Sequence, residues 1–293
     1  MDIFLAQLLN ALLYAAVLFL IAGGLSLIFG VMRIVNLAHG SLYALGAYVM
    51  AWGLGRLAGE SGSEPVYLIA LLPVAAVAVG ATGAVVEPIL LRPLYARAEE
   101  YQLLLTFGLL LILEDAMRYI WGPTPLTASP LWAAFGTLHL MGATYPRYNV
   151  VVILLGVLTA VLLWAFVFKT RFGVMLRATS QNRRMAAALG INVGGVYVQA
   201  FALGCLMAGL AGAVIVPIQG AVLGMGVDAL VLAFVVVVIG GLGSLDGALV
   251  GALIVGVVRT VAIQYFPELE LAVLYLIAAV VLITRPAGLL GRA

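Results

Sequence analysis

Charged residues are scarce in this sequence. Only 9% of the 293 residues are Asp, Glu, Lys or Arg, whereas a soluble domain contains about 25%. Hydrophobic residues make up 65% of the chain, and its mean hydropathy is +1.23. A net charge of +2 gives no support to nucleic-acid binding. The scarcity of charge therefore excludes an ordinary soluble domain and predicts an integral membrane protein in contact with lipid.

The residues that catalysis and metal binding require are also few. Cys205 is the only cysteine, which excludes an intramolecular disulfide and a cysteine-clustered metal site. Lys169, the only lysine, follows Phe168 rather than glycine, so the chain has no P-loop with which to hydrolyse ATP. His39 and His139 lie far apart, and H-E-x-x-H is absent. We therefore predict that the chain is not an enzyme and holds no metal ion or cofactor.

Long apolar runs recur along the whole chain. A transmembrane helix needs about 20 mainly apolar residues. Such runs cover residues 4–31, 40–57, 66–90, 102–121, 149–168, 196–217, 226–241, 247–264 and 271–284. We predict an all-α polytopic membrane protein with one transmembrane domain over residues 1–293, eight or nine crossings, and broken or re-entrant segments. Because the first run is too long for one straight crossing, it either tilts or ends near Gly23 and Gly24 and re-enters before Asn36.

Small residues recur at helical spacing in two of these runs. Gly247 and Gly251 form a GxxxG pair, and Gly204, Ala208 and Gly212 repeat the same spacing. In lipid, such stripes let helix backbones approach closely. We therefore expect tight helix packing at both stripes.

Basic residues collect in one segment, "KTRFGVMLRATSQNRRMAAALGINV" at residues 169–193, which contains no acid. The positive-inside rule assigns it to the cytoplasm, and alternation of the later spans then gives a cytoplasmic C-terminus. One interpretation is a solvated loop that only sets topology. However, the segment has helix-forming composition up to Gly190 and is long for a passive connection. We therefore favour a docking element for a cytoplasmic partner, such as an ATPase.

Polar residues interrupt the hydrocarbon at "IVNLAHGSLYALGAY", residues 34–48, where Asn36, His39, Gly40 and Ser41 lie close together. These groups either satisfy backbone left unpaired by a helix break or line a polar path, and the two interpretations are compatible. A weak echo occurs in "LGSLDGALVGALIV" at 242–255. Paired glycine-interrupted segments in two halves of a chain point to a transport site inside the membrane.

Ionisable residues within the apolar runs are expected to face protein. Glu114 and Arg118 are spaced i, i+4, which predicts a structural ion pair in preference to a substrate site. Arg259 is expected to pair with Glu268 or Glu270.

Three ordered motifs carry a resemblance to a known family. They are "GLSLIFGVMRIVNLAHGSLYALGAYV" (24–49), "LRATSQNRRMAAALGINV" (176–193) and "AFVVVVIGGLGSLDGALVGALIVG" (233–256), followed by the ending "RPAGLLG" (285–291). Over nearly its whole length, the chain resembles the permease subunit of branched-chain amino-acid ABC importers. The Asn-Leu-Ala-His-Gly core is similar to the H-type of the two paired permeases.

The resemblance implies function, partners and site residues. It implies an inner-membrane permease of a bacterium or archaeon that works with a second permease subunit, different or identical, two cytoplasmic ATPases that bind ATP, and an extracytoplasmic solute-binding protein. The candidate translocation pathway comprises Ser26, Asn36, His39, Gly40, Ser41, Gly240, Gly241, Gly243 and Ser244. The candidate ATPase-coupling loop comprises Arg177, Ala178, Gln181, Ala186, Ala187, Gly190 and Asn192.

Two alternatives concern the solute and the energy source. Leu232 stands where a charged residue is expected in many members of this family, so an ABC permease for urea or amides is an alternative to one for branched-chain amino acids. A secondary transporter driven by an ion gradient would need an intramembrane carboxylate, and Glu114 with Asp115 is the densest candidate.

Overall fold

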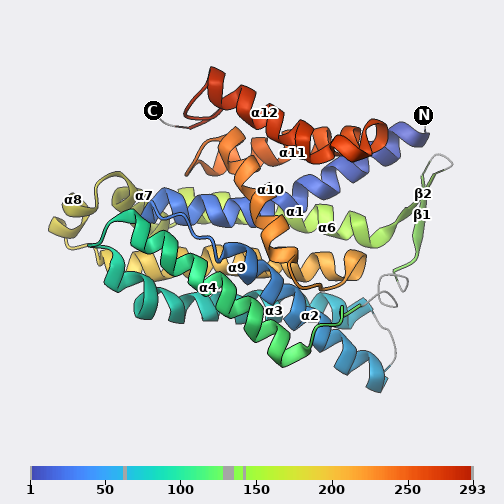
Figure 1. Ribbon diagram of the computed structural model, residues 1–293, viewed down its shortest axis with the longest axis horizontal. Helices are drawn as coiled ribbons and strands as arrows, with labels where there is room; N and C mark the ends of the chain where they lie inside the picture. Colours follow the sequence, from blue (N-terminus) through green and yellow to red (C-terminus); the bar gives the residue numbers. More distant parts are fainter. Residues whose placement is uncertain (1, 62–64, 128–134, 141–142, 292–293) are drawn as a thin grey trace.

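The computed structural model describes residues 2–61, 65–127, 135–140 and 143–291. Its helices confirm the all-α polytopic class (Figure 1). They are α1 (Asp2–Met32), α2 (His39–Ser61), α3 (Pro65–Val86), α4 (Glu99–Trp121), α6 (Arg147–Lys169), α7 (Arg171–Gln181), α8 (Arg183–Ala188), α9 (Val193–Gln219), α10 (Met225–Gly240), α11 (Leu245–Tyr265) and α12 (Glu270–Thr284). A π-helical turn, Glu87–Leu91, and two 3₁₀ turns, Arg92–Leu94 and Pro267–Leu269, join some of them.

Six helical segments in the described part of the chain are long and apolar enough to cross a membrane. They are Phe4–Met32, Ile69–Leu94, Arg147–Lys169, Val193–Gln219, Leu245–Tyr265 and Pro267–Thr284. Helix α10 is apolar but has only 16 residues. Strands β1 (Thr137–Leu140) and β2 (Ala143–Pro146) form an antiparallel pair, in which Leu138 lies opposite Tyr145.

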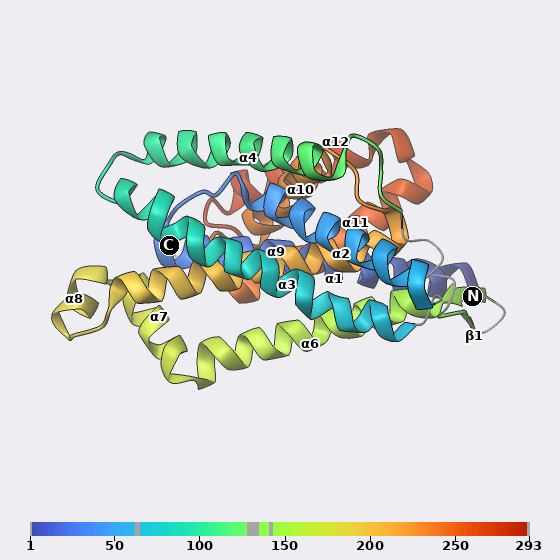
Figure 2. The same ribbon diagram turned by 90° about the horizontal axis from the view of Figure 1, so that it is seen from below.

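Helix α1 lies at the centre of the bundle. In its most apolar window 78% of the residues are buried, compared with 11% for the span that contains α12. It packs against α6, α9, α10 and α11. Figures 1 and 2 show α1, α3, α6 and α9 running along a common direction, while α10 crosses α1 at a steep angle in Figure 1.

Of the two alternatives for the long first run, the break near Gly23 and Gly24 does not occur, because α1 continues through both residues to Met32. The glycines instead allow close packing: a Cβ on Gly24 would lie 2.6 Å from the backbone oxygen of Gly204 in α9. The chain leaves the helix at Arg33, whose φ is +56°. Residues 33–38 are not helical, and they lead back to α2. The interruption before α2 is therefore real, but it follows a long, unbroken first helix.

The predicted small-residue stripes lie at close helix contacts. A Cβ on Gly212 would lie 1.9 Å from the backbone oxygen of Tyr43 in α2, and one on Gly251 would lie 2.3 Å from that of Val236 in α10. Any larger residue would push these backbones apart. The expectation of tight packing is thus confirmed at both stripes.

Candidate translocation pathway and coupling segment

The polar residues before and at the start of α2 are fully buried. Ser26, Asn36 and His39 are each 0% exposed, and Ser41 is 1% exposed. The Nε2 atom of His39 lies 3.0 Å from the backbone oxygen of Ile21 in α1. Because a carbonyl oxygen only accepts hydrogen bonds, Nε2 must carry the proton in this contact. Ser41 donates its hydroxyl to the backbone oxygen of Leu110 in α4, at 3.3 Å.

Two nitrogen atoms of this group have no hydrogen-bond partner among the described residues: Nδ2 of Asn36 and Nδ1 of His39. Asn36 uses its side-chain oxygen to accept from the backbone N–H of Ala38, at 3.1 Å. Asn36 therefore satisfies backbone left unpaired near the helix break, which is the first of the two interpretations of these polar residues. The group also keeps a free amide donor and a free imidazole nitrogen in the interior, which buried polar groups rarely do.

The second glycine-rich segment lies between α10 and α11. The hydroxyl of Ser26 donates to the backbone oxygen of Ser244, at 3.1 Å, which ties this segment to α1. Gly241 and Gly243 have φ values of +115° and +77°, which residues with a Cβ rarely adopt. Ser244 caps α11 by accepting from the N–H of Gly247, at 3.0 Å.

The two predicted segments contact opposite ends of α10. At its start, a Cβ on Gly40 would lie 2.0 Å from the backbone oxygen of Gly226. At its end, a Cβ on Gly240 would lie 2.0 Å from the backbone oxygen of Gly247 in α11. Ser26 and Ser244 are brought together, but no side-chain hydrogen bond within the described ranges joins Asn36, His39 or Ser41 to residues 240–244.

The basic segment forms α7 and α8, which project at one end of the molecule (Figure 1). Its residues differ in exposure. Ala186 is buried, Arg177 and Ala178 are half-buried, and Gln181, Ala187, Gly190 and Asn192 are exposed. Arg177 donates to the backbone oxygen of Val167, which ties α7 to the end of α6. Asn192 caps α9 by accepting from the N–H of Gly195, at 3.0 Å.

Two apolar residues that sequence analysis missed stand out on this segment. Met185 is 58% exposed and Leu189 is 74% exposed, both on or next to the short helix α8. Beside them, a cavity of about 480 Å³ lies between the end of α1, the loop before α4 and the basic segment. Its lining includes the side chains of Arg33, Arg97 and Arg184. The segment thus combines positive charge with exposed apolar groups.

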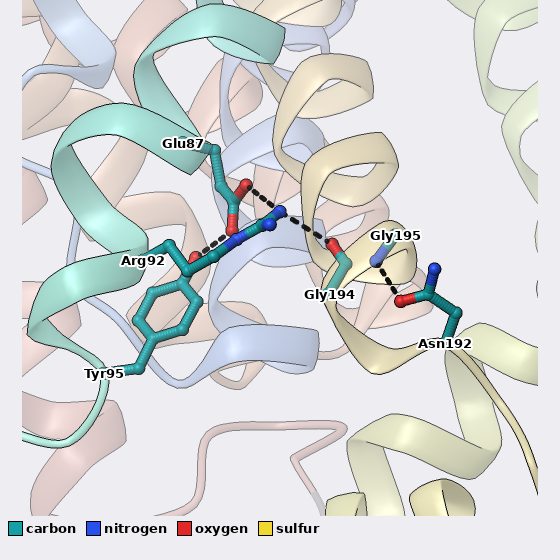
Figure 3. Close-up of polar contacts among 6 residues, drawn as sticks. All are labelled: Glu87, Arg92, Tyr95, Asn192, Gly194 and Gly195. Atoms are coloured by element: carbon teal, nitrogen blue, oxygen red, sulfur yellow. Dashed lines mark hydrogen bonds and ion pairs between the residues drawn. The ribbon is translucent and has the colours of Figure 1, made fainter.

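A buried carboxylate lies next to the base of this segment (Figure 3). Glu87 is 0% exposed and accepts from Arg92 Nη2, at 3.0 Å, and from the Tyr95 hydroxyl, at 2.5 Å. Arg92 Nη2 also donates to the backbone oxygen of Gly194 at the start of α9, at 3.3 Å. Burial, and then the hydrogen bond to Glu87, raise the pKa of Tyr95 above its usual value. Sequence analysis overlooked this network, which links the end of α3 to the start of α9.

The predicted ion pairs have mixed outcomes. Arg259 pairs with Glu270, as expected, at 2.5 Å. The pair between Glu114 and Arg118 is wrong, since the ion pairs in the described part of the chain are those of Arg259 with Glu270 and Arg92 with Glu87. Arg118 is exposed, and an exposed pair gains too little to fix two long side chains.

Comparison with protein families shows to which family this chain belongs. A family model described as "Branched-chain amino acid transport system / permease component" matches residues 7–283. The chain belongs to this permease family. The family is one of transport permeases and not of enzymes, and the membership confirms the resemblance predicted from the three motifs. With its apolar helices, the permease is a multi-pass membrane protein.

Relatives of the permease match it over most of its length. It is 28% identical to the high-affinity branched-chain amino acid transport system permease protein BraD of Pseudomonas aeruginosa, over 99% of this chain and 96% of the relative. It is 28% identical to LivH of Escherichia coli K12, with the same coverage. It is 29% identical to a probable LivH of Methanocaldococcus jannaschii, over 87% of this chain and 80% of the relative. No solved structure gives a significant match.

Proposed function

We propose that this permease moves branched-chain or other small neutral amino acids inward across the cytoplasmic membrane of a bacterium or archaeon, driven by separate ATPase subunits. The observation that carries the proposal is the family match over residues 7–283, together with relatives that are named branched-chain amino acid transport permeases. The comparisons give no support to the alternatives of a urea or amide permease or of an ion-driven secondary transporter. ATP would bind to the partner subunits.

The proposed partners are a second permease subunit, two cytoplasmic ATPases and an extracytoplasmic solute-binding protein. The exposed apolar side chains of Met185 and Leu189 support an ATPase contact at the basic segment, because they are four positions apart and adjoining exposed apolar groups with polar surroundings mark interaction sites. We propose that the contact is centred on α8 and the exposed residues Gln181, Ala187 and Gly190.

The order of helices supports nine crossings. Helices α2 and α4 would add two crossings to the six long apolar spans, and residues 220–224 together with α10 would complete a ninth. With α7 and α8 in the cytoplasm, α9 runs outward, α10 returns inward, and α11 and α12 complete one more pair. This order gives an outer N-terminus and a cytoplasmic C-terminus, in agreement with the positive-inside rule.

Purification from the native membrane tests the proposal. The expected result is recovery of an ATPase and a second permease subunit, with ATP-dependent uptake of labelled leucine by reconstituted vesicles. Leu189→Glu should reduce ATPase recovery at least tenfold, because it places a charge in the proposed apolar contact. Leu290→Glu is the matched control, since Leu290 is also an exposed leucine outside the long apolar spans, at 47%. Uptake of leucine without ATP would contradict the proposal.

A further inference from the structure

A polar cavity of about 480 Å³ lies at the end of α1, on the side from which α7 and α8 project. Its lining comes from residues 31–34 at the end of α1, from the loop before α4 with the α4 start, and from residues 179–184 between α7 and α8. Figure 2 shows the α4 start and the α7–α8 segment at the same end of the molecule. Because α7 and α8 are assigned to the cytoplasm, the cavity lies on the cytoplasmic side of the membrane.

The cavity has an excess of positive charge. One acid, Glu99, lines it together with four exposed arginines, Arg33, Arg97, Arg183 and Arg184. Neither ion pair formed by the described residues involves any of these arginines. Helices α1 and α7 also end at the cavity, and each helix end is equivalent to about half a negative charge. Four guanidinium groups against one carboxylate and two helix ends leave an excess of about two positive charges, which attracts an anion.

A buried hydroxyl adds a hydrogen-bond donor to this lining. Thr179 lines the cavity and is 2% exposed, and its Oγ1 has no hydrogen-bond partner among the described residues. Buried hydroxyl groups are nearly always hydrogen-bonded, so this one lacks an acceptor. The guanidinium group of arginine pairs well with phosphate, because two parallel N–H donors fit two phosphate oxygens. A phosphate group would therefore satisfy the arginines and the hydroxyl of Thr179 together.

A second, smaller cavity of about 180 Å³ adjoins the first on the side of α4. The two cavities share lining residues, among them Arg33, and the smaller one adds three apolar side chains, Phe29, Val35 and Leu103. Leu103 and its neighbour Leu104 are also exposed on α4, at 39% and 69%. Arg33 directly follows the apolar span Phe4–Met32, so it lies where the hydrocarbon of the membrane gives way to the headgroups. The ligand that fits both cavities therefore has a phosphate group and an apolar chain.

We propose that the larger cavity binds the phosphate headgroup of an anionic phospholipid from the cytoplasmic leaflet, and that the first part of an acyl chain lies along the smaller cavity. Basic cavities between membrane helices on the cytoplasmic side suit such headgroups. The bound phosphate reduces the repulsion among the arginines and holds the end of α1, the start of α4 and the α7–α8 segment together. This inference goes beyond the proposed transport function and uses only its assignment of α7 and α8 to the cytoplasm.

The test is native mass spectrometry of the purified transporter complex titrated with phosphatidylglycerol, and with phosphatidylcholine, which has no net charge. Phosphatidylglycerol should bind the wild type about tenfold more tightly than phosphatidylcholine. The double variant Arg33→Gln with Arg97→Gln should lose this preference, because each basic side chain contributes several-fold to the affinity for an anionic headgroup. The matched control, Lys169→Gln with Arg171→Gln, removes the same charge from exposed residues of the same segment that line neither cavity.

A second variant, Thr179→Val, keeps the shape of the side chain and all the arginines but removes the unpartnered hydroxyl. It should weaken the binding of phosphatidylglycerol several-fold without lowering the thermal stability of the lipid-free complex. The same variant therefore tests the site even if the double arginine variant does not fold.

The outcomes separate this inference from the proposed function. Unchanged binding of phosphatidylglycerol by the double arginine variant overturns the inference. Loss of the ATPase from that variant also overturns it, because the arginines would then serve subunit contact. Displacement of phosphatidylglycerol by an equal concentration of inorganic phosphate would assign the cavity to a soluble anion and refute the lipid. None of these measurements involves leucine, so a complex that binds the lipid as expected but moves no leucine with ATP refutes the proposed function alone.

Discussion

Replacing Arg92 by methionine would leave the Glu87 carboxylate buried without its ion-pair partner. Removing one member of a buried pair costs about 3–5 kcal/mol in general. Two features of this site lower that figure. The Arg92 side chain is 45% exposed, so water already weakens its attraction for Glu87, and the Tyr95 hydroxyl continues to donate to Glu87 after the change. We therefore expect Arg92→Met to destabilise the folded permease by about 2 kcal/mol, near the cost of one unsatisfied buried polar group.

A double-mutant cycle makes this prediction specific. Chemical unfolding in detergent would be measured for Arg92→Met, Glu87→Gln and the double variant. Glutamine keeps a carbonyl oxygen that can accept from Tyr95 but carries no charge, so the double variant should recover about 1 kcal/mol relative to Arg92→Met. If the two single effects simply add, or if Arg92→Met unfolds with the wild-type free energy, Glu87 does not depend on Arg92 and the reasoning fails.

Two further predictions concern packing and pH. Gly40→Ala should prevent stable folding, because its Cβ would lie 2.0 Å from the backbone oxygen of Gly226. Gly108→Ala is the control in α4, where a Cβ meets open space, and it should stabilise the protein by about 0.5–1 kcal/mol. Thermal unfolding of both variants in detergent measures the difference. The pKa of Tyr95 is raised above its ordinary value of 10.0. Below about pH 10 the Tyr95 phenol is protonated in both the folded and the unfolded protein. Above about pH 10 the unfolded chain loses this proton first, so the free energy of unfolding should fall as the pH rises. Unfolding from about pH 9 to about pH 11 should show a shallower decline for Tyr95→Phe.

Six of the predicted apolar runs correspond to the long apolar helices of the described residues, because hydropathy measures the cost of placing a residue in lipid. The sequence left open whether the first helix breaks at Gly23 and Gly24, because glycine has two roles in membrane helices. The same residue that weakens a helix also lets two helices touch, and here the second role prevails at the contact of Gly24 with Gly204. Helix α1 ends at Met32, and the next residue, Arg33, has a positive φ for which no residue preference gives a signal.

The Glu87 network escaped sequence analysis for a related reason. Glu87 lies inside a run that was interpreted only as apolar. Glu87 and Arg92 are five positions apart, which is not a contact spacing of the α-helix, but the π-helical turn Glu87–Leu91 helps to bring them together.

The two glycine-rich motifs both need glycine because of helix α10. The motif before and at the start of α2 meets α10 through Gly40, and the motif between α10 and α11 meets α1 through Ser244. Because α10 crosses the bundle steeply, each of its ends lies against neighbouring backbone, where a Cβ does not fit. Glycine is therefore required at both ends, and the tilt of α10 makes the two distant motifs parts of a single arrangement. The same tilt starts α10 at the level of Gly40, next to the His39 ring that bonds to the backbone oxygen of Ile21 within α1.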